Sequence, residues 1–342
     1  MPYHTPLRYP GGKRRLAPVI TSLLEKNNLK DIQYFEPYAG GASIALALLF
    51  GEYASIVHIN DLSLPIYAFW YTVLNHTREL CQRIEGVDVT MDEWYRQRAV
   101  YENQATATLP DLGFATLFLN RTNHSGVIAG GVIGGKEQAG AWRLDARFNR
   151  SEVIQRIERV GRYRTRINLY GLDGIDFTKH VVPQADHNIL VFYDPPYIDK
   201  GEALYLNNYS LKDHQTLADD VAQLDCPWVV TYDHDAAIRY GLYDSYRRLV
   251  YELSYSAQER YAGREVMFIS GNLELPDSWN SLTPVCMSSP HCEHPFYGML
   301  EEIRPELPLT QKWRKAYEKS NDSRLCEERS VRTCHGKRIL RM

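Results

Sequence analysis

Residues 188–197 read Asn-Ile-Leu-Val-Phe-Tyr-Asp-Pro-Pro-Tyr, and this stretch decides the fold class. Its apolar, β-rich run up to Tyr193 predicts a buried strand. The two prolines end that strand, because proline removes a ladder donor and keeps the residue before it out of the helical region. The Asp194 carboxylate and the Tyr197 ring are therefore held at the carboxyl end of a strand, where open α/β sheets bind ligands. For this stretch alone, a strand followed by an ordinary turn is the alternative.

Strands and helices alternate on both sides of this stretch. Further strands are expected at 32–36, 55–60, 166–171, 228–232, 248–254 and 265–270. The last two follow each other directly, which predicts an α/β domain with a mostly parallel sheet and a C-terminal antiparallel hairpin. Residues 64–163 are mainly helical in pattern and are expected to be an insertion. The domain then comprises residues 1–63 and 164–276, and residues 277–342 form a poorly ordered tail.

Composition restricts the class of protein. The chain has 342 residues and a net charge of −3, which does not by itself indicate a nucleic-acid partner. It has neither an apolar signal sequence nor an apolar run of about 18 residues, so we expect a cytoplasmic protein with no membrane segment. Four of the six cysteines lie in the tail, and the spacing of Cys286, His291, Cys292 and His294 fits no standard zinc site. No metal is expected.

A glycine turn, Pro37-Tyr38-Ala39-Gly40-Gly41-Ala42-Ser43, separates the strand at 32–36 from an apolar helix at 44–49. Backbone N–H groups at such a helix start can face a nucleotide-like ligand, and Ser43 is the expected N-cap. The next strand ends at Asp61, where an acid commonly accepts hydrogen bonds from ribose hydroxyls. Asp61 could also be the N-cap of a helix at 64–76, and both roles could hold.

Three further segments suit anionic ligands. Residues 6–15 form a glycine turn with Lys13 in a cationic cluster, which could meet a carboxylate or a phosphate, or could be solvated. Residues 142–166 hold eight arginines and three acids, as a phosphate-binding face requires. The glycine-rich loop at 117–135 adds many side-chain donors suited to phosphate and base contacts. A flexible surface loop is the alternative for residues 117–135, and a solvated helix face is the alternative for residues 142–166.

Four features together resemble the Dam-type adenine-N6 DNA methyltransferases. They are the Pro-Gly-Gly-Lys turn at 10–13, the glycine turn at 37–43 (the cradle), the arginine-rich segment at 142–166 and the Asp-Pro-Pro-Tyr strand end at 194–197. The resemblance covers about residues 6–272 and also includes the Leu-Asn-Arg-Thr-Asn-His-Ser-Gly loop and the Arg-Glu-Val-Met-Phe-Ile-Ser strand. One departure is Ala42, where the family usually has glycine. The resemblance implies a Rossmann-like methyltransferase sheet with an inserted helical DNA-recognition region.

The resemblance also implies roles for individual residues. The residues expected to bind S-adenosyl-L-methionine are Tyr9, Gly11 and Lys13 at its methionine end, Glu36, Tyr38, Gly40 and Ser43 in the cradle, Asp61 at the ribose, and Asp176 and Phe177 at the adenine. The residues expected to be catalytic are Asp194, Pro195, Pro196 and Tyr197. The residues expected to face DNA are Arg121, Asn123, Arg143, Arg147, Arg156 and Arg159.

The expected reaction is transfer of a methyl group from S-adenosyl-L-methionine to the N6 amine of an adenine flipped out of double-stranded DNA. The resemblance implies a monomer in a prokaryotic or phage context, either paired with a restriction endonuclease in a restriction–modification system or acting alone. Two other functions remain open: an amino-methyltransferase acting on RNA or protein, and a catalytically silent DNA-binding module of the same fold.

Overall fold

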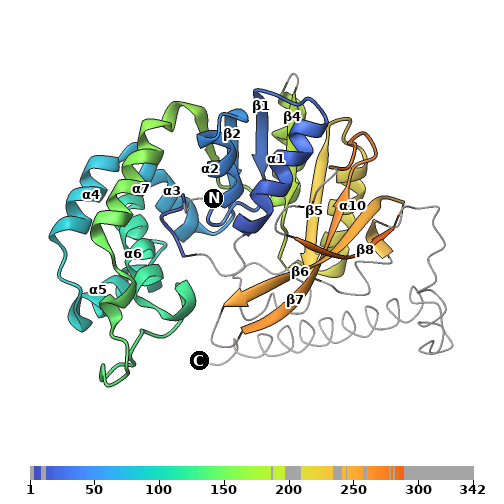
Figure 1. The fold of residues 1–342 in the computed structure, drawn as a ribbon. Helices are drawn as coiled ribbons and strands as arrows, with labels where there is room; N and C mark the ends of the chain where they lie inside the picture. The colour runs from blue at the N-terminus through green and yellow to red at the C-terminus, as the bar shows by residue number, and fades with distance from the viewer. Residues whose placement is uncertain are drawn as a thin grey trace, which may run out of the picture. The chain divides into compact units, whose positions relative to one another are not determined.

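Within the part of the chain that the structure describes, the strands form an eight-stranded sheet in the order β3-β2-β1-β4-β5-β7-β6-β8 (Figure 1). The structure is a computed structural model that describes residues 4–8, 13–185, 188–196, 209–233, 241–243, 245–256, 260–276, 279 and 282–288. All of these belong to one compact unit, Met1–Pro290. The strands are β1 (Ile32–Glu36), β2 (Ala54–Asn60), β3 (Ile167–Tyr170), β4 (Ile189–Tyr193), β5 (Trp228–Asp233), β6 (Arg247–Ser256), β7 (Arg260–Ile269) and β8 (Thr283–Ser288).

The strand directions confirm the predicted sheet. Strands β1 to β5 are parallel, whereas β7 runs antiparallel between β5 and β6. Strand β1 pairs with β2 on one side and with β4 on the other, so the chain reverses its direction of winding at this point. In open α/β sheets, ligands bind where the carboxyl ends of two such strands diverge.

Helices cover both faces of the sheet. The helices are η1 (Lys13–Leu16), α1 (Ala17–Lys26), α2 (Ser43–Phe50), α3 (Leu64–Asn75), α4 (Thr77–Gly86), α5 (Met91–Glu102), α6 (Leu109–Thr122), η2 (His124–Gly126), η3 (Leu144–Arg147), α7 (Arg150–Arg162), η4 (Arg164–Arg166), α8 (Gly174–His180), η5 (Val182–Gln184) and α10 (Leu211–Ala222). In β4, Leu190 and Phe192 pack in the core with α1 and α2, whereas Val191 and Tyr193 pack with α8 and α10. Side chains of a strand alternate between faces, so the arrangement has three layers.

The helices α3 to α7 lie between β2 and β3 in the chain, beside the sheet (Figure 1). Their buried residues, such as Trp70 and Ile157, join the same apolar core as α1 and α2. Gly113 lets α3 and α6 approach closely, because a Cβ there would lie 2.2 Å from Oγ1 of Thr72. The helices are therefore packed against the sheet by a shared core.

The segment after residue 276 differs from the prediction of a poorly ordered tail. Residues Thr283–Ser288 form β8, which pairs antiparallel with β6. The reason is that the outer edge of β6 offers unpaired backbone N–H and C=O groups that a further strand can satisfy. The remainder of the predicted tail, from residue 289 onward, lies outside the described residues. None of the helices in the described residues has the length and hydropathy that a membrane span requires.

Candidate active site

Asp194 lies directly after β4, between the ends of β1 and β5. Its Oδ1 atom accepts a hydrogen bond from Oγ1 of Thr231 at 3.0 Å and lies 3.3 Å from Nζ of Lys13. Both contacts use Oδ1, and no hydrogen bond to Oδ2 comes from the described residues. The side chain is 23 % exposed, so the carboxylate is held at one oxygen and accessible to a ligand. Pro195 is buried beside it.

The chain around the strand end is only partly described. Pro196 is half-buried, and Tyr197, the last residue of the predicted catalytic motif, lies outside the described residues. The same holds for Tyr9 and Gly11, which were predicted to lie near the methionine end of the cofactor.

Lys13 reaches Asp194 from the start of the chain and is itself buried. Its Nζ atom lies 2.7 Å from Oε1 of Glu265, and Oε2 of Glu265 accepts a hydrogen bond from the Tyr251 hydroxyl at 2.7 Å. Glu265 is only 1 % exposed. The sequence interpretation missed Glu265 and Tyr251, although a glutamate at the start of the apolar run Val-Met-Phe-Ile is an unusual residue for a central strand.

Burial raises the pKa of Asp194 to about 6. The Lys13 ammonium and the Thr231 hydroxyl act in the opposite direction, and the Glu265 carboxyl adds to the rise. The balance leaves Asp194 ionised at neutral pH and near its titration range, as a group that must accept hydrogen bonds or a proton requires.

The turn between β1 and α2 begins at Glu36, which is buried. Its Oε1 atom accepts hydrogen bonds from the Tyr34 hydroxyl at 3.0 Å and from the backbone N–H of Ala45 at 3.1 Å. Burial raises the pKa of Glu36 to about 8. Glu36 therefore accepts a hydrogen bond from a backbone N–H group at the start of α2, where the N-cap side chain accepts none.

The expected N-cap, Ser43, is the first residue of α2, and the N-cap is Ala42. Ala42 makes no side-chain cap hydrogen bond and has φ 48° and ψ 38°, in the left-handed region. Glycine adopts this conformation without strain, which explains physically why this position favours glycine and why Ala42 is unusual here.

Asp61 holds the same turn from the end of β2. Its Oδ2 atom accepts from the Gly40 N–H and its Oδ1 atom from the Ser63 N–H, each at 2.9 Å, while the Trp70 indole donates to the Gly40 carbonyl at 2.8 Å. Burial raises the pKa of Asp61 to about 6. The alternative role of Asp61 as N-cap does not hold, since Ser63 occupies that position in α3.

The two residues predicted to bind the cofactor's adenine, Asp176 and Phe177, both lie on α8 but differ in exposure. Asp176 is exposed, but Phe177 is 0 % exposed and packs on Phe35 and Tyr170, so its ring offers no surface to a ligand. In this structure the Phe177 ring completes the core.

Asp173, which the sequence interpretation did not select, caps α8 and accepts hydrogen bonds from the Tyr209 hydroxyl at 3.0 Å. The Tyr38 hydroxyl in turn donates to that of Tyr209 at 3.1 Å. Tyr38 also packs against the start of α8, where a Cβ on Gly174 would lie 2.3 Å from its ring. The cradle, α8 and the segment leading into α10 are thus joined by hydroxyl groups.

The residues predicted to face DNA fall into two groups. Arg121 and Asn123 are buried at 5 % and 0 % exposure. Arg121 donates to the Pro6 carbonyl, and Asn123 accepts from the Trp94 indole at 2.7 Å and donates to the Ile128 carbonyl at 2.8 Å. In this structure these two side chains therefore shape the loop that follows α6.

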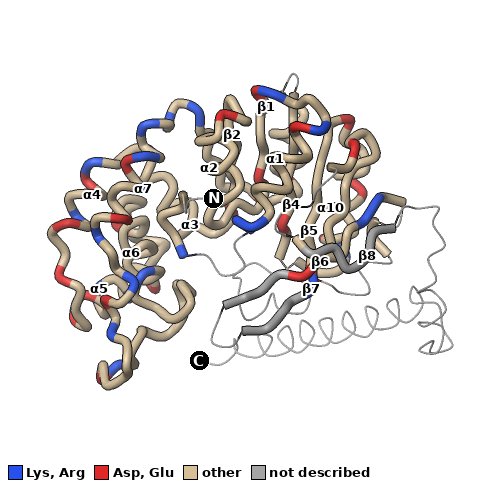
Figure 2. Tube along the Cα trace, in the orientation of Figure 1, with Lys and Arg blue, Asp and Glu red and all other residues tan. Residues whose placement is uncertain are grey.

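The other four arginines are at least partly accessible. Arg143 and Arg147 are exposed. Arg156 pairs with Glu152 and donates to the Thr5 carbonyl, and Arg159 stacks on Phe50 with its guanidinium carbon 4.2 Å from the ring centre. Along α7, acidic residues are interleaved with the arginines (Figure 2).

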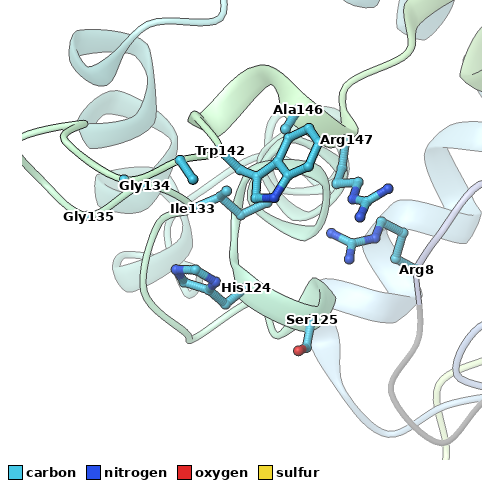
Figure 3. A pocket seen from close by; sticks show the side chains of 11 residues that line it. Arg8, His124, Ser125, Ile133, Gly134, Gly135, Trp142, Ala146 and Arg147 are labelled. Atoms are coloured by element: carbon cyan, nitrogen blue, oxygen red, sulfur yellow. The ribbon is translucent and has the colours of Figure 1, made fainter. Parts of the chain in front are cut away.

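A cavity of about 410 Å³ opens beside η3. Figure 3 shows Arg8, Arg147, His124 and the 71 % exposed indole of Trp142 around it. Arg8 comes from the N-terminal segment and was not predicted to take part. The cavity combines cations with an aromatic face, as nucleic-acid sites do. Among the described residues, no group of His, Cys, Asp or Glu is arranged to hold a metal ion.

The sequence model of the D12 class N6 adenine-specific DNA methyltransferases matches residues 9–257. No curated protein sequence matches the chain. Among solved structures, the rRNA methyltransferase AviRa from Streptomyces viridochromogenes is similar, with a TM-score of 0.37, 14 % identity, and coverage of 77 % of this chain and 87 % of that one. The yhhF protein of Escherichia coli has a TM-score of 0.31, 12 % identity and coverage of 77 % and 88 %. Likenesses this weak carry no assignment.

Proposed function

Since the chain belongs to the D12 class of N6 adenine-specific DNA methyltransferases, we propose that it transfers a methyl group from S-adenosyl-L-methionine to the N6 amine of adenine in DNA. The observation that carries the proposal is the state of Asp194. Thr231 and Lys13 hold its Oδ1 atom, and Oδ2 is left to a ligand at the reversal point of the sheet. That is where an acceptor for the substrate amine belongs.

The chemistry requires help because the lone pair of an adenine amine is delocalised into the ring. Oδ2 of Asp194 and the carbonyl oxygen of Pro195 would each accept a hydrogen bond from one N–H group of the amine. These two hydrogen bonds would draw the nitrogen toward tetrahedral geometry. When bound, S-adenosyl-L-methionine supplies an electrophilic methyl group on a sulfonium. The Asp194 carboxylate, ionised above pH 6, would take the proton that the amine loses. Positioning supplies most of the remaining acceleration.

The cradle residues fit a nucleoside ligand. Gly40 has φ 46°, and its N–H and C=O groups are already bonded to Asp61 and Trp70, so the turn is preformed. The Asp61 carboxylate accepts two backbone N–H groups and retains lone pairs for ribose hydroxyls. We assign the cofactor to this turn, with Tyr38, Ser43 and Glu36 supporting it and the exposed Asp176 as the partner for its adenine.

The target adenine would reach Asp194 by leaving the stack of double-stranded DNA, and Tyr197 would stack on it. Arg143 and Arg147 would contact phosphates, and Arg156 and Arg159 would add positive charge along α7. The buried Arg121 and Asn123 would act indirectly, by fixing the loop that begins at His124. We further propose that the protein is a cytoplasmic monomer of a prokaryote or phage, with or without a partner restriction endonuclease.

Isotope-labelled S-adenosyl-L-methionine tests the proposal with DNA, RNA and protein offered separately to the purified chain. We expect label in DNA alone, at N6 of adenine. Label in RNA or protein would instead show that the chain is an amino-methyltransferase that acts on RNA or protein. DNA binding with no transfer and no cofactor binding would establish a silent binding module.

A further inference from the structure

Glu265 is an acidic residue that the reaction outlined above does not use. It lies on β7, where it pairs in register with Asp233 of β5 and with Tyr251 of β6. The four residues after it, Val266 to Ile269, are all buried and apolar. Placing a carboxyl group in such a strand costs free energy unless it is paired and hydrogen-bonded. Glu265 therefore needs a reason to lie there.

Its contacts lead directly to the proposed reaction centre. One oxygen, Oε2, accepts the Tyr251 hydroxyl, and the other, Oε1, lies 2.7 Å from Nζ of Lys13. The same Nζ lies 3.3 Å from Oδ1 of Asp194. The ammonium is thus nearer to Glu265 than to Asp194, and all three side chains are at least three-quarters buried.

We propose that Glu265 is a positioning residue for methyl transfer, which seats the Lys13 ammonium against Oδ1 of Asp194 and so leaves Oδ2 for the substrate amine. This inference rests on the proposed function of Asp194. Glu265 itself does not touch the reacting atoms, because its contact with Asp194 passes through Lys13. Tyr251 serves the same purpose one step further away by orienting the Glu265 carboxyl group.

The charged and titratable groups around Asp194 determine the signature of this role. They are Lys13 from η1, Tyr34 and Glu36 from β1, Tyr232 from β5, Tyr251 from β6 and Glu265 from β7. Burial raises the pKa of each of the three phenols well above 10, so they are neutral near pH 7. Lys13 lowers the pKa of Asp194 and Glu265 raises it. Removal of the Lys13 charge should therefore raise the pKa of Asp194, and removal of the Glu265 charge should lower it.

The test measures kcat and KM against pH for Glu265→Gln, Glu265→Ala and Lys13→Met. Gln can still accept from Lys13 but has no charge, so Glu265→Gln should keep the plateau kcat within about threefold and move the acid limb about one pH unit lower. Lys13→Met should move the acid limb higher. Glu265→Ala removes the support for Lys13 and should lower kcat by about 10- to 100-fold with little change in KM.

Glu252→Gln is the matched control. Glu252 lies on the neighbouring strand β6 and pairs with Arg264 at the surface, where both side chains are at least 40 % exposed. The same change of charge there should leave both kcat and the acid limb unchanged. A wild-type kcat for Glu265→Ala, or an acid limb for Glu265→Gln that stays in place or moves higher, would overturn the proposal.

A second readout is independent of catalysis. In protein with 13C-labelled aspartate carboxyl groups, the Asp194 signal is identified by its loss in Asp194→Asn, and its titration is followed by NMR. Glu265→Gln should lower that midpoint and Lys13→Met should raise it, even if Glu265→Ala fails to fold. Absence of wild-type methyl transfer would refute the proposed function, whereas unmoved midpoints would refute the role of Glu265.

Discussion

The hydroxyl of Thr231 on β5 donates a hydrogen bond to Oδ1 of Asp194 across 3.0 Å. The Thr231 hydroxyl oxygen also lies 3.2 Å from the carbonyl oxygen of Tyr193, so Thr231 joins the carboxyl ends of β4 and β5. This bond stabilises the ionised form of Asp194 against the effect of burial. A side chain on a neighbouring strand thus helps to determine the charge of the proposed catalytic group.

Thr231→Val should therefore raise the pKa of Asp194, since it removes a hydrogen bond that lowers it. A group that acts in its ionised form loses activity as pH falls through its pKa. The acid limb of the kcat–pH profile should move about half to one pH unit higher. Thr116→Val is the control, because its buried hydroxyl donates within α6 to the Leu112 carbonyl. A shift equal to that of the control would contradict the role of Thr231.

Glu36→Gln should stabilise the protein in alkaline solution. Burial raises the folded-state pKa of Glu36 from 4.5 to about 8, so the folded protein keeps a proton that the unfolded chain releases. The contribution of protonated Glu36 to the free energy of unfolding is fully present below about pH 4.5 and is lost as pH rises through 8. A neutral Gln can still accept from Ala45 and avoids that loss.

Thermal and denaturant unfolding at two pH values check this expectation. Glu36→Gln should exceed the wild type by about 1–3 kcal/mol at pH 8.5 and differ little at pH 5. Glu137→Gln, in an exposed loop, should show no such pH dependence. A Gln variant that is destabilised equally at both pH values would show that the carboxyl group is needed in its charged form.

Ala42→Gly should change the free energy of unfolding by less than about 1 kcal/mol, because relief of the left-handed conformation offsets the loss of a buried methyl group and the entropy of glycine. Ala45→Gly in the same helix is the matched comparison, since both alanines are fully buried. It gains no such relief and should lose about 1–2 kcal/mol. Equal losses at the two positions would contradict the strain at Ala42.

The double substitution Arg143→Gln, Arg147→Gln should weaken binding to any DNA sequence and reduce the slope of log K against log salt by about 2. The pair Arg156→Gln, Arg159→Gln should act in the same direction. Since Arg159 stacks on Phe50, an unfolding measurement must accompany that pair. Lys179→Gln on α8, paired with Asp220, is the control and should leave the slope unchanged. An unchanged slope for both pairs would place the DNA surface elsewhere.

Local pattern was sufficient for β1 to β7 and for the place of Asp194 at the end of a strand, but not for β8. The run Ile-Leu-Val-Phe-Tyr before Asp194 specifies a buried strand, and the prolines after it specify where that strand ends. The pairing of Lys13 with Glu265 could not be predicted for a physical reason: the two residues are 252 positions apart, and only the folded sheet brings them together. Likewise, the sequence alone allows Phe177, beside Asp176, to be either a ligand contact or a core residue. In the structure its side chain is fully buried in the core.

Mapping of N6-methyladenine in DNA from cells that produce the wild-type chain or its Asp194→Ala variant tests the central proposal most directly. Cells with the wild type should carry modified adenines at a defined sequence, and cells with the variant should carry none. The variant should still bind S-adenosyl-L-methionine, which shows that it is folded. Equal adenine methylation by the two proteins would contradict the role of Asp194.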